Sequence, residues 1–567
     1  MSNPFIEEIA QQVSDAAGMA PDALTDLVEV PPDPEMGDYA LPCFALAKTL
    51  RKAPDRIAEE LAQKVAPGER ISRVRAVGPY LNFFVNRADF VQKTLSEILA
   101  KGRDYGQGEE GAGKTVVIDF SHPNIAKPFG IHHLRSTVIG NALRNLFRAL
   151  GYTVVGINHL GDWGSQFAKL IVAWKRWGSG EFTEDISIET LLELYVRIHE
   201  EIENDPDVES EASEWFRRLE NQDPEAQNMW KVCCTISYKE FDRVYRMLGI
   251  AFESIAGESF YLDKMAETLG RLEKKGLTQI SEGATIVDLS PWDMPPMIVR
   301  RSDDASLYAT RDIAAAEYRW QTYAFDRMLY VVDVAQTLYF KQLFKALELM
   351  GYHWSRKCTH VVFGRLRFKD GGMSTRRGKI VFLEDVLNRA VELTRKIIEE
   401  KNPDLPDKDE VARDVGIGAV IYADLDSRRM RDVVFDWDEV LNFNGETGPY
   451  VQYTHARYCS VLRRYGKAIP PSDVDLSLLT EPETVAVVKR LEQFPSRIRN
   501  AAGTCEPSLI ASYLIELCTE ANRFYNTHRV VSEDEALTTA RIALVYAITL
   551  VLAGGLRLLG MKAPERM

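Results

Sequence analysis

The sequence predicts a multidomain α/β protein with a doubly wound parallel sheet, a mixed α+β N-terminal unit and an all-α C-terminal helix bundle. The sheet is predicted by a strand, helix, strand pattern within residues 115–158, because that unit builds parallel sheets. The bundle is predicted by apolar residues at purely helical spacing from about residue 484 onward. With 567 residues, the chain is also too long for a single core.

The N-terminal unit is expected to cover residues 1–110. It opens with a helical pattern and ends in a strand-like run at residues 80–85, and a glycine-rich link follows at residues 106–113. Because such links separate packed segments, this one is the predicted boundary.

The sheet domain is expected to cover residues 111–390. Short apolar runs at residues 115–120 and 153–158 enclose a helical pattern, and runs of this length indicate buried strands. Two later runs, at residues 328–333 and 360–364, predict further strands of the same sheet.

Helices are predicted for the other parts of the chain. Residues 181–225 hold 16 Asp or Glu against 3 Arg or Lys, which predicts a helical insertion near residues 178–235 with a solvated outer face. Residues 391–435 are expected to connect the sheet domain to a helical domain at residues 436–567. Residues 542–556 are 15 positions without a charge, fewer than the roughly 20 that span a bilayer, so a buried helix is expected there.

Composition narrows the class of protein. Hydrophobic residues make up 46% and charged residues 27%, as in ordinary globular proteins. The start of the chain lacks a basic and apolar leader, so we expect a cytoplasmic protein without membrane contact. The seven cysteines form no CxxC pair, which argues against structural zinc. The net charge of -14 argues against a general nucleic-acid coat, although local basic clusters can still contact phosphates.

The loop after the 115–120 strand carries the first chemical pattern. Residues 121–135 read SHPNIAKPFGIHHLR. In a doubly wound sheet, ligands bind at the carboxyl ends of the strands, where helix N-termini suit phosphate. Asn124, Lys127 and the imidazoles of His132 and His133 are the groups needed to hold a triphosphate and stabilise the charge that develops during nucleotidyl transfer.

This loop resembles the HIGH signature of class I aminoacyl-tRNA synthetases, in the longer form that marks arginyl-tRNA synthetases. Asn124, Lys127 and residues 133–137 match that form, whereas Gly130 and His132 stand where the family has His and Gly. The resemblance implies a Rossmann-type catalytic domain. The catalytic and ATP-contacting residues that it implies in this loop are Lys127, His133, Gly130 and His132.

Residues 368–378, which read FKDGGMSTRRG, are similar to the family's KMSKS-type loop. In the family this second cationic loop clamps the ATP phosphates from the other side. Gly372 replaces the leading lysine, and Lys369, Arg376 or Arg377 could supply the missing charge, because phosphate binding needs a cation within reach more than one fixed position. The implied catalytic residues here are Lys369, Ser374 and Arg376, and the implied ATP contacts are Met373 and Ser374.

The resemblance also implies an arginine pocket, because a planar guanidinium requires carboxylates. Glu258 lies in a Gly-Glu-Ser run. Tyr308 and Asp312 match a Y-x-T-x-D pattern that sets them one helical turn apart, and Gln336 is expected at the end of a strand. Glu258 and Asp312 are expected to hold the guanidinium with Tyr308 packed on it. Asn124 and Gln336 are expected to orient the α-amino group.

Both ends of the chain resemble tRNA-binding domains of arginyl-tRNA synthetases. Residues 37–40 and 78–83 are like the N-terminal domain that contacts the tRNA elbow, and residues 448–457 are like the helical anticodon-binding domain. Anticodon readers need aromatic faces for bases and basic groups for phosphates. The residues of this kind that are expected to contact tRNA are Tyr450, Tyr453, Arg457 and Arg463.

The resemblance therefore implies a monomeric ligase that activates L-arginine with ATP and Mg²⁺ to arginyl-adenylate. It then transfers the arginyl group to the terminal ribose of tRNA(Arg), releasing AMP and pyrophosphate, and no protein-bound metal is expected. One alternative is another class I synthetase or adenylate-forming transferase, which the amino acid that supports ATP–pyrophosphate exchange would reveal. A second is a non-catalytic RNA-binding paralogue, suggested by Gly130, His132 and Gly372, which would not charge tRNA with arginine.

Overall fold

The computed structural model describes residues 4–31, 36–68, 70–301, 308–368, 381–471 and 473–567. The chain forms two compact units. The first consists of Met1–Gly102, Leu462–Glu492 and Thr519–Ile548, and the second of Arg103–Val461, Gln493–Cys518 and Thr549–Met567.

The first unit contains a three-stranded antiparallel sheet with helices around it. The strands β1 (Tyr39–Pro42), β3 (Tyr80–Val85) and β2 (Ile71–Val77) lie in the order β1-β3-β2. The helices of this part of the chain are α1 (Pro4–Ala17), α2 (Asp22–Thr25), α3 (Phe44–Leu50), α4 (Pro54–Lys64) and α5 (Arg87–Lys101). The bounds of β3 agree with the strand predicted at residues 80–85, in which Leu81, Asn82, Phe83 and Val85 are buried.

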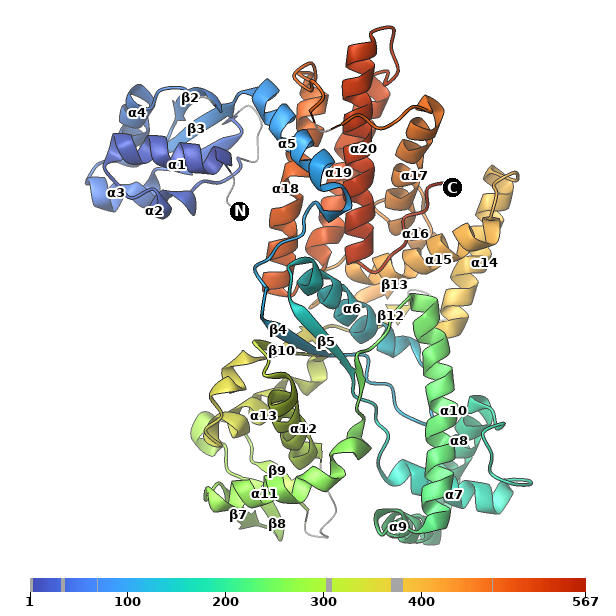
Figure 1. Ribbon diagram of the computed structural model, residues 1–567. Coiled ribbons are helices and arrows are strands. Elements are labelled where there is room, and N and C mark those ends of the chain that lie inside the picture. The colour runs from blue at the N-terminus through green and yellow to red at the C-terminus, as the bar shows by residue number, and fades with distance from the viewer. Residues whose placement is uncertain (1–3, 32–35, 69, 302–307, 369–380, 472) are drawn as a thin grey trace. The chain divides into compact units, whose positions relative to one another are not determined.

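The second unit is built on a five-stranded parallel sheet (Figure 1). Its strands are β4 (Thr115–Asp119), β5 (Thr153–Asn158), β6 (Ser254–Ile255), β10 (Arg327–Asp333) and β11 (Cys358–Phe363). They lie in the order β11-β10-β4-β5-β6, all parallel. The chain therefore runs outward from β4 in one direction and then from β10 in the other, which places a topological switch point between β4 and β10. The predicted doubly wound sheet is confirmed.

Helices cover both faces of this sheet. Val117 and Met328 belong to a buried cluster with side chains of α12 (Tyr308–Tyr323) and α13 (Thr337–Leu349). Phe120 has the opposite parity to Val117, and it lies against α6 (Leu134–Ala149), where a Cβ on Gly140 would be 2.3 Å from the Phe120 side chain. Because neighbouring residues of a strand point to opposite faces, α6 covers one face while α12 and α13 cover the other.

Two insertions interrupt the sheet. The segment between β5 and β6 contains α7 (Ser165–Trp177), α8 (Ile188–Asn204), α9 (Pro206–Glu220) and α10 (Pro224–Leu248), and the insertion predicted near residues 178–235 falls within it. Asp223 caps α10 by accepting from the backbone N–H groups of Glu225 and Ala226, and Gly249 ends it with φ 67°. The second insertion follows α11 (Met265–Lys274) and was not predicted from the sequence. It is an antiparallel sheet of β7 (Thr278–Ser281), β8 (Ala284–Val287) and β9 (Met297–Arg300).

The remainder of the chain is mostly helical, as predicted. A short parallel pair, β12 (Leu366–Phe368) with β13 (Val433–Phe435), brackets α14 (Leu383–Lys401) and α15 (Lys408–Leu425). The helices that follow are α16 (Trp437–Val440), α17 (Gly448–Tyr465), α18 (Pro482–Thr504), α19 (Ser508–Thr527) and α20 (Glu535–Leu558). By length and composition alone α20 could cross a membrane, but 67% of its most apolar window is buried within the protein, which agrees with the buried helix predicted at residues 542–556.

A buried ion pair joins α6 to α15. Arg135 Nε lies 2.8 Å from Asp424 Oδ1, and both side chains are 1% exposed. The guanidinium also donates to the carbonyl oxygen of Arg431 at 2.8 Å. Burial raises the pKa of Asp424 to about 6, although the charge of Arg135 opposes this rise. The pair holds α6 against α15, in the helical region that follows the sheet.

We expect Arg135→Met to destabilise the protein by about 3 kcal/mol, because it leaves the Asp424 carboxylate buried without its partner. The measurement is the midpoint of thermal unfolding. The double variant Arg135→Met with Asp424→Leu should recover much of the loss, since it removes both charges. A single variant as stable as the parent protein would contradict this account.

Candidate active site

The loop after β4 adopts a backbone conformation that few residues tolerate. Ser121, His122 and Ala126 have φ values of 83°, 52° and 62°, a region that side chains with a Cβ rarely occupy. Such strain persists only where surrounding contacts hold it, and it concentrates at functional sites. Surrounding contacts therefore hold this loop, which follows β4 at the carboxyl edge of the sheet, in its strained conformation.

Contacts with the loop after β5 hold this conformation. Asn124 forms a parallel β-bridge with Gly161, in which Ile125 N–H donates to the Gly161 carbonyl at 3.1 Å and Gly161 N–H donates to the Pro123 carbonyl at 3.1 Å. A Cβ on Gly161 would lie 2.2 Å from Asn124 Oδ1. Only glycine leaves room for the Asn124 amide at its observed place.

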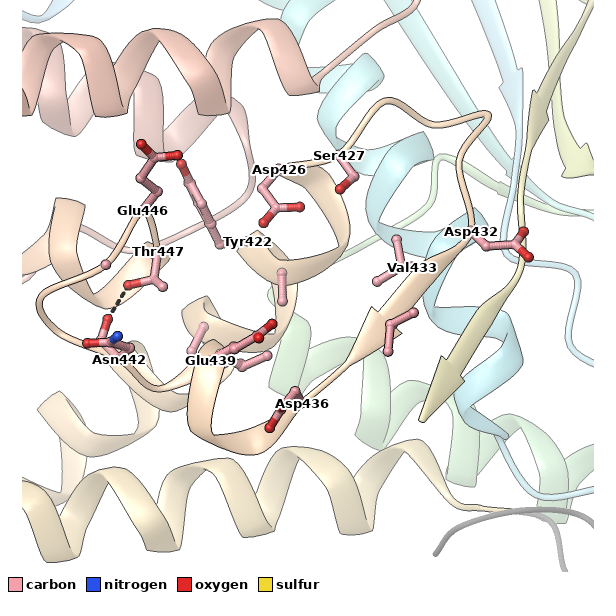
Figure 2. A pocket seen from close by; sticks show the side chains of 16 residues that line it. Tyr422, Asp426, Ser427, Asp432, Val433, Asp436, Glu439, Asn442, Glu446 and Thr447 are labelled. Atoms are coloured by element: carbon pink, nitrogen blue, oxygen red, sulfur yellow. Dashed lines mark hydrogen bonds between the residues drawn. The ribbon is translucent and has the colours of Figure 1, made fainter. Parts of the chain in front are cut away.

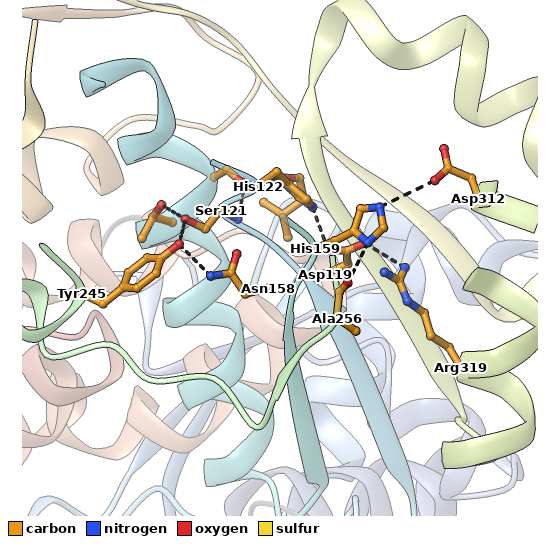
Figure 3. A network of polar contacts seen from close by, with 12 residues as sticks. Asp119, Ser121, His122, Asn158, His159, Tyr245, Ala256, Asp312 and Arg319 are labelled. Carbon is orange, nitrogen blue, oxygen red and sulfur yellow. Dashed lines mark hydrogen bonds and ion pairs between the residues drawn. The ribbon is translucent and has the colours of Figure 1, made fainter. Parts of the chain in front are cut away.

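A buried hydroxyl network anchors the start of the same loop (Figure 3). Ser121 N–H donates to Ser136 Oγ at 2.8 Å. Ser121 Oγ lies 2.7 Å from Thr137 Oγ1 and 2.8 Å from the Tyr245 hydroxyl, which also accepts from Asn158 Nδ2 at 3.0 Å. The network links β4, α6, β5 and α10. Sequence reasoning did not identify Asn158 and Tyr245, because their partners are distant in the chain.

The two histidines of the signature lie at the start of α6. They form a single 3-10 turn, Ile131–His133, with ring centroids 4.0 Å apart. His132 is exposed, whereas His133 packs edge-on against Phe129 at 5.5 Å. Burial lowers the pKa of His133 well below its ordinary value, and the nearby imidazoles of His132 and His122 lower it further. His133 is therefore neutral at pH 7.

Lys127 and Gly130 complete the signature loop. The Lys127 ammonium lies 4.6 Å from the centroid of the Tyr195 ring, which places a cation beside the loop. Gly130 is buried and forms an antiparallel bridge with Phe382. Lys369, Met373, Ser374 and Arg376, predicted for the second loop, lie outside the described residues.

An ion pair buried at the carboxyl end of β4 connects the sheet to α12. Asp119 Oδ2 lies 2.8 Å from a terminal nitrogen of Arg319, and these side chains are 4% and 2% exposed. Asp119 Oδ1 lies 2.7 Å from His122 Nε2. Burial alone would raise the pKa of Asp119, but the charges of Arg319 and then His122 outweigh it, so the pKa lies below its ordinary value. Asp119 is therefore ionised.

The structure places Glu258 beside Arg311 of the chain itself. The two form an ion pair in which the side chains are 14% and 4% exposed. Burial raises the pKa of Glu258 to about 8, and Arg311 opposes this rise. Backbone contacts hold the segment in place, since Glu258 N–H donates to the Leu160 carbonyl at 3.0 Å. Asp162, in the same β5 loop, accepts from the N–H and the Oγ of Ser259, both at 2.7 Å.

Asp312 lies one turn into α12. The hydroxyl group of Tyr339 donates to Asp312 Oδ2, and Asp312 Oδ1 lies 3.9 Å from His159 Nε2. Tyr308 begins the same helix, as the Y-x-T-x-D pattern predicted, although its side chain is not described. Gln336 is exposed and lies in the 3-10 turn Val334–Gln336 after β10 rather than at the end of the strand itself.

These contacts bring separate predicted residues to one edge of the sheet. Asn124 bridges the loop after β5, the same loop holds Glu258 through Leu160, and His159 of that loop faces Asp312. Two carboxylates, an amide and a strained loop thus lie on connected segments at this edge. Such an arrangement can bind a cationic amino acid beside a nucleotide.

Family profiles match nearly the whole chain. Residues 4–85 match the N-terminal domain of arginyl-tRNA synthetase, residues 94–437 match the catalytic domain of class I tRNA synthetases (R), and residues 451–567 match the DALR anticodon-binding domain. The arginine–tRNA ligase of Halothermothrix orenii is 50% identical over 563 residues, which is 99% of both chains. The chain belongs to the arginyl-tRNA synthetase family. It is a class I arginine–tRNA ligase, and the alternative of another class I synthetase is wrong.

Other relatives agree with this placement. The arginine–tRNA ligase of Alkaliphilus metalliredigens is 48% identical over 550 residues, or 97% of each chain. The solved arginyl-tRNA synthetase of Thermus thermophilus is 26% identical and superimposes with a TM-score of 0.82, covering 99% of this chain and 100% of that one.

The residues predicted to contact tRNA lie on α17. The inner face of this helix is structural, since Gln452 donates to the carbonyl groups of Asp414 and Lys562 at 3.1 and 2.9 Å. Tyr453 is 40% exposed, and the Arg457 guanidinium lies 4.9 Å from its ring centroid. Tyr450 is half-buried and Arg463 is exposed. An arginine stacked on an exposed tyrosine is a surface that suits RNA.

A cavity of about 360 Å³ lies between the end of α15, β13, α16 and the start of α17 (Figure 2). Its lining includes the acidic residues Asp426, Asp432, Asp436, Glu439 and Glu446. Burial raises the pKa of Asp426 to about 6. None of the predicted site residues lines this cavity, and its carboxylates would repel phosphate groups. We therefore do not assign ATP to it.

We expect Gly161→Ala to raise the KM for arginine about tenfold, because the added Cβ displaces the Asn124 amide. The midpoint of thermal unfolding should change little, since Asn124 is exposed and can move aside. Gly503→Ala in α18 is the matched control, because a Cβ there meets nothing within 4 Å. An unchanged KM in Gly161→Ala would contradict the role given to this close approach.

Proposed function

We propose that arginyl-adenylate forms at the carboxyl edge of the parallel sheet, above the switch point between β4 and β10. The observation that carries this proposal is the convergence of Asn124, Glu258 and Asp312 on the loop after β5. Ligands of doubly wound sheets bind at this place. The arginine side chain and the triphosphate then lie on neighbouring loops.

Arginine binds with its guanidinium at Asp312 and Glu258. Asp312 is 28% exposed, so its carboxylate is both desolvated and reachable, which favours a charge-assisted pair with a fork of N–H donors. Tyr308 packs on the guanidinium plane. Asn124 and Gln336, both exposed at the sheet edge, orient the α-amino group.

ATP binds with Mg²⁺ along the loop that begins α6. Lys127 supplies a cation, and the neutral His133 lies beside the phosphates at the start of α6 without adding charge. Gly130 and His132 line the nucleotide side of the loop. The second loop acts through Lys369, Met373, Ser374 and Arg376. Its cations replace the charge of the lysine that the family has where this sequence has Gly372.

The reaction proceeds in two displacements. A carboxylate oxygen of arginine attacks the α-phosphorus of ATP, and the bond from that phosphorus to the bridging oxygen breaks, so pyrophosphate leaves. A hydroxyl group of the terminal ribose of tRNA(Arg) then attacks the carbonyl carbon of the adenylate, and AMP leaves. The protein acts by positioning and by stabilising the phosphoryl charge, without a covalent intermediate.

The tRNA contacts lie on the two terminal parts of the chain. In the N-terminal sheet the Arg73 guanidinium lies 3.8 Å, and that of Arg75 5.6 Å, from the ring centroid of Phe84, which supports an elbow-binding role for residues 1–110. Tyr450, Tyr453, Arg457 and Arg463 support an anticodon-binding role for residues 436–567.

The catalytic and helical parts of the chain are separate domains in this proposal. Residues 111–390 form the catalytic domain with its helical insertion near residues 178–235, and residues 391–435 connect it to the helical domain. The enzyme acts as a cytoplasmic monomer.

We expect Asp312→Asn to raise the KM for arginine about 100-fold, equivalent to roughly 2.7 kcal/mol, because a buried charge pair with the guanidinium is lost. The Kd for ATP should stay within threefold. The measurement is aminoacylation of tRNA with labelled arginine.

Asp263→Asn is the control for this prediction, because that carboxylate is 77% exposed and lies in the same region of the chain as Glu258. A KM for arginine equal to that of the parent protein in Asp312→Asn would contradict the placement of the arginine pocket at Asp312.

We expect His132→Gly to retain kcat within threefold and to lower the KM for ATP, because it restores the family's glycine beside the nucleotide. ATP–pyrophosphate exchange in the presence of tRNA measures both constants. Complete loss of exchange would show that this histidine has a role of its own.

A further inference from the structure

His159 follows β5 directly and is held in one orientation. Its side chain is 14% exposed, and its ring centroid lies 5.7 Å from that of Tyr261. Its Nδ1 lies 3.0 Å from the carbonyl oxygen of Ala256 (Figure 3). A carbonyl oxygen can only accept a hydrogen bond, so Nδ1 carries a proton. The charge of the imidazole therefore depends only on whether Nε2 also carries a proton.

The charged surroundings of this ring leave Nε2 without a proton at neutral pH. Burial lowers the pKa of His159, and Arg319 and His122 lower it further, whereas Asp119 and Asp312 raise it. The net effect is a lowered pKa, because burial outweighs the two carboxylates. Nε2 therefore presents a lone pair.

This lone pair faces a second acceptor. Nε2 lies 3.9 Å from Asp312 Oδ1, while the other oxygen of Asp312 is occupied by the Tyr339 hydroxyl group. Two acceptors that face each other at this distance are best satisfied by a donor with two hydrogens placed between them.

We propose that His159 is a specificity-determining residue for arginine, with its Nε2 and Asp312 Oδ1 accepting the two hydrogens of one terminal guanidinium nitrogen. A nitrogen about 2.9 Å from each acceptor fits this separation. The assignment rests on the proposed function, which places the guanidinium at Asp312. A carboxylate alone attracts any cation, whereas a neutral second acceptor adds a requirement for two divergent N–H groups on one planar nitrogen.

A ligand that lacks this second hydrogen tests the assignment. In symmetric dimethylarginine each terminal nitrogen keeps only one hydrogen. Calorimetry on the full chain should give a Kd at least tenfold weaker for this analogue than for arginine. Equal affinity of the parent protein for the two ligands would overturn the proposal.

Two variants separate the acceptor from the rest of the side chain. In His159→Asn the amide still reaches the Ala256 carbonyl as a donor but offers no acceptor at the place of Nε2. It should bind arginine about tenfold more weakly, while the Kd for symmetric dimethylarginine changes less than threefold. In His159→Gln the longer amide reaches the place of Nε2 and should restore most of the preference for arginine. Parallel weakening of both ligands in His159→Asn would show a merely structural role and overturn the proposal.

Asp312→Asn separates the location of the arginine pocket from the contact that we propose for His159. If Asp312→Asn loses arginine while His159→Asn weakens both ligands in parallel, His159 is not an arginine contact and the pocket stands. If Asp312→Asn binds arginine as the parent protein does, the pocket itself is misplaced and His159 falls with it. Thermal unfolding midpoints close to that of the parent protein establish that the variants are folded.

Discussion

The site depends on one buried charge at the end of the central strand. Asp119 is ionised in a place almost without water, and such a charge is tolerated only with a close partner. That partner is Arg319 at 2.8 Å, which fastens α12 to the carboxyl end of β4. Asp312 lies two helical turns before Arg319 on the same side of α12. The ion pair that neutralises Asp119 therefore also sets the position of the carboxylate that we assign to arginine.

Local sequence patterns predicted the parts of this site but not their contacts. The bounds of β3, β5 and the start of α6 followed from apolar runs and helical spacing, which are properties of neighbouring residues. The Ser121, Tyr245 and Asn158 network, and the Asp119 pair with Arg319, join residues that are distant in the chain. Such partners depend on the order of strands in the sheet, which no local pattern records. The short strand β6 and the sheet of β7, β8 and β9 were missed because their runs are too short to stand out.

The two carboxyl groups of the site, Glu258 and Asp312, have different partners within the chain. Glu258 is paired with Arg311 of the chain itself, and burial raises its pKa to about 8, so little of its attraction is left for an incoming substrate. Asp312 instead accepts a hydrogen bond from the Tyr339 hydroxyl group, and the imidazole of His159, 3.9 Å away, is neutral. Its carboxylate therefore keeps most of its attraction for a cation. An incoming guanidinium gains more from Asp312 than from Glu258, because at Glu258 it must share the carboxylate with Arg311.

The residues that set the conformation of the signature loop do not include His132, which departs from the family pattern. Ser121, His122 and Ala126 hold the loop in left-handed conformations, whereas His132 is not among the residues with positive φ. His132 is exposed in a regular 3-10 turn, so the backbone there has no need of glycine. We therefore propose that the glycine which the family carries at this position serves the approach of the nucleotide. The fold can accept His132 because the bridge between Asn124 and Gly161 and the Ser121 network, rather than this turn, impose the shape of the loop.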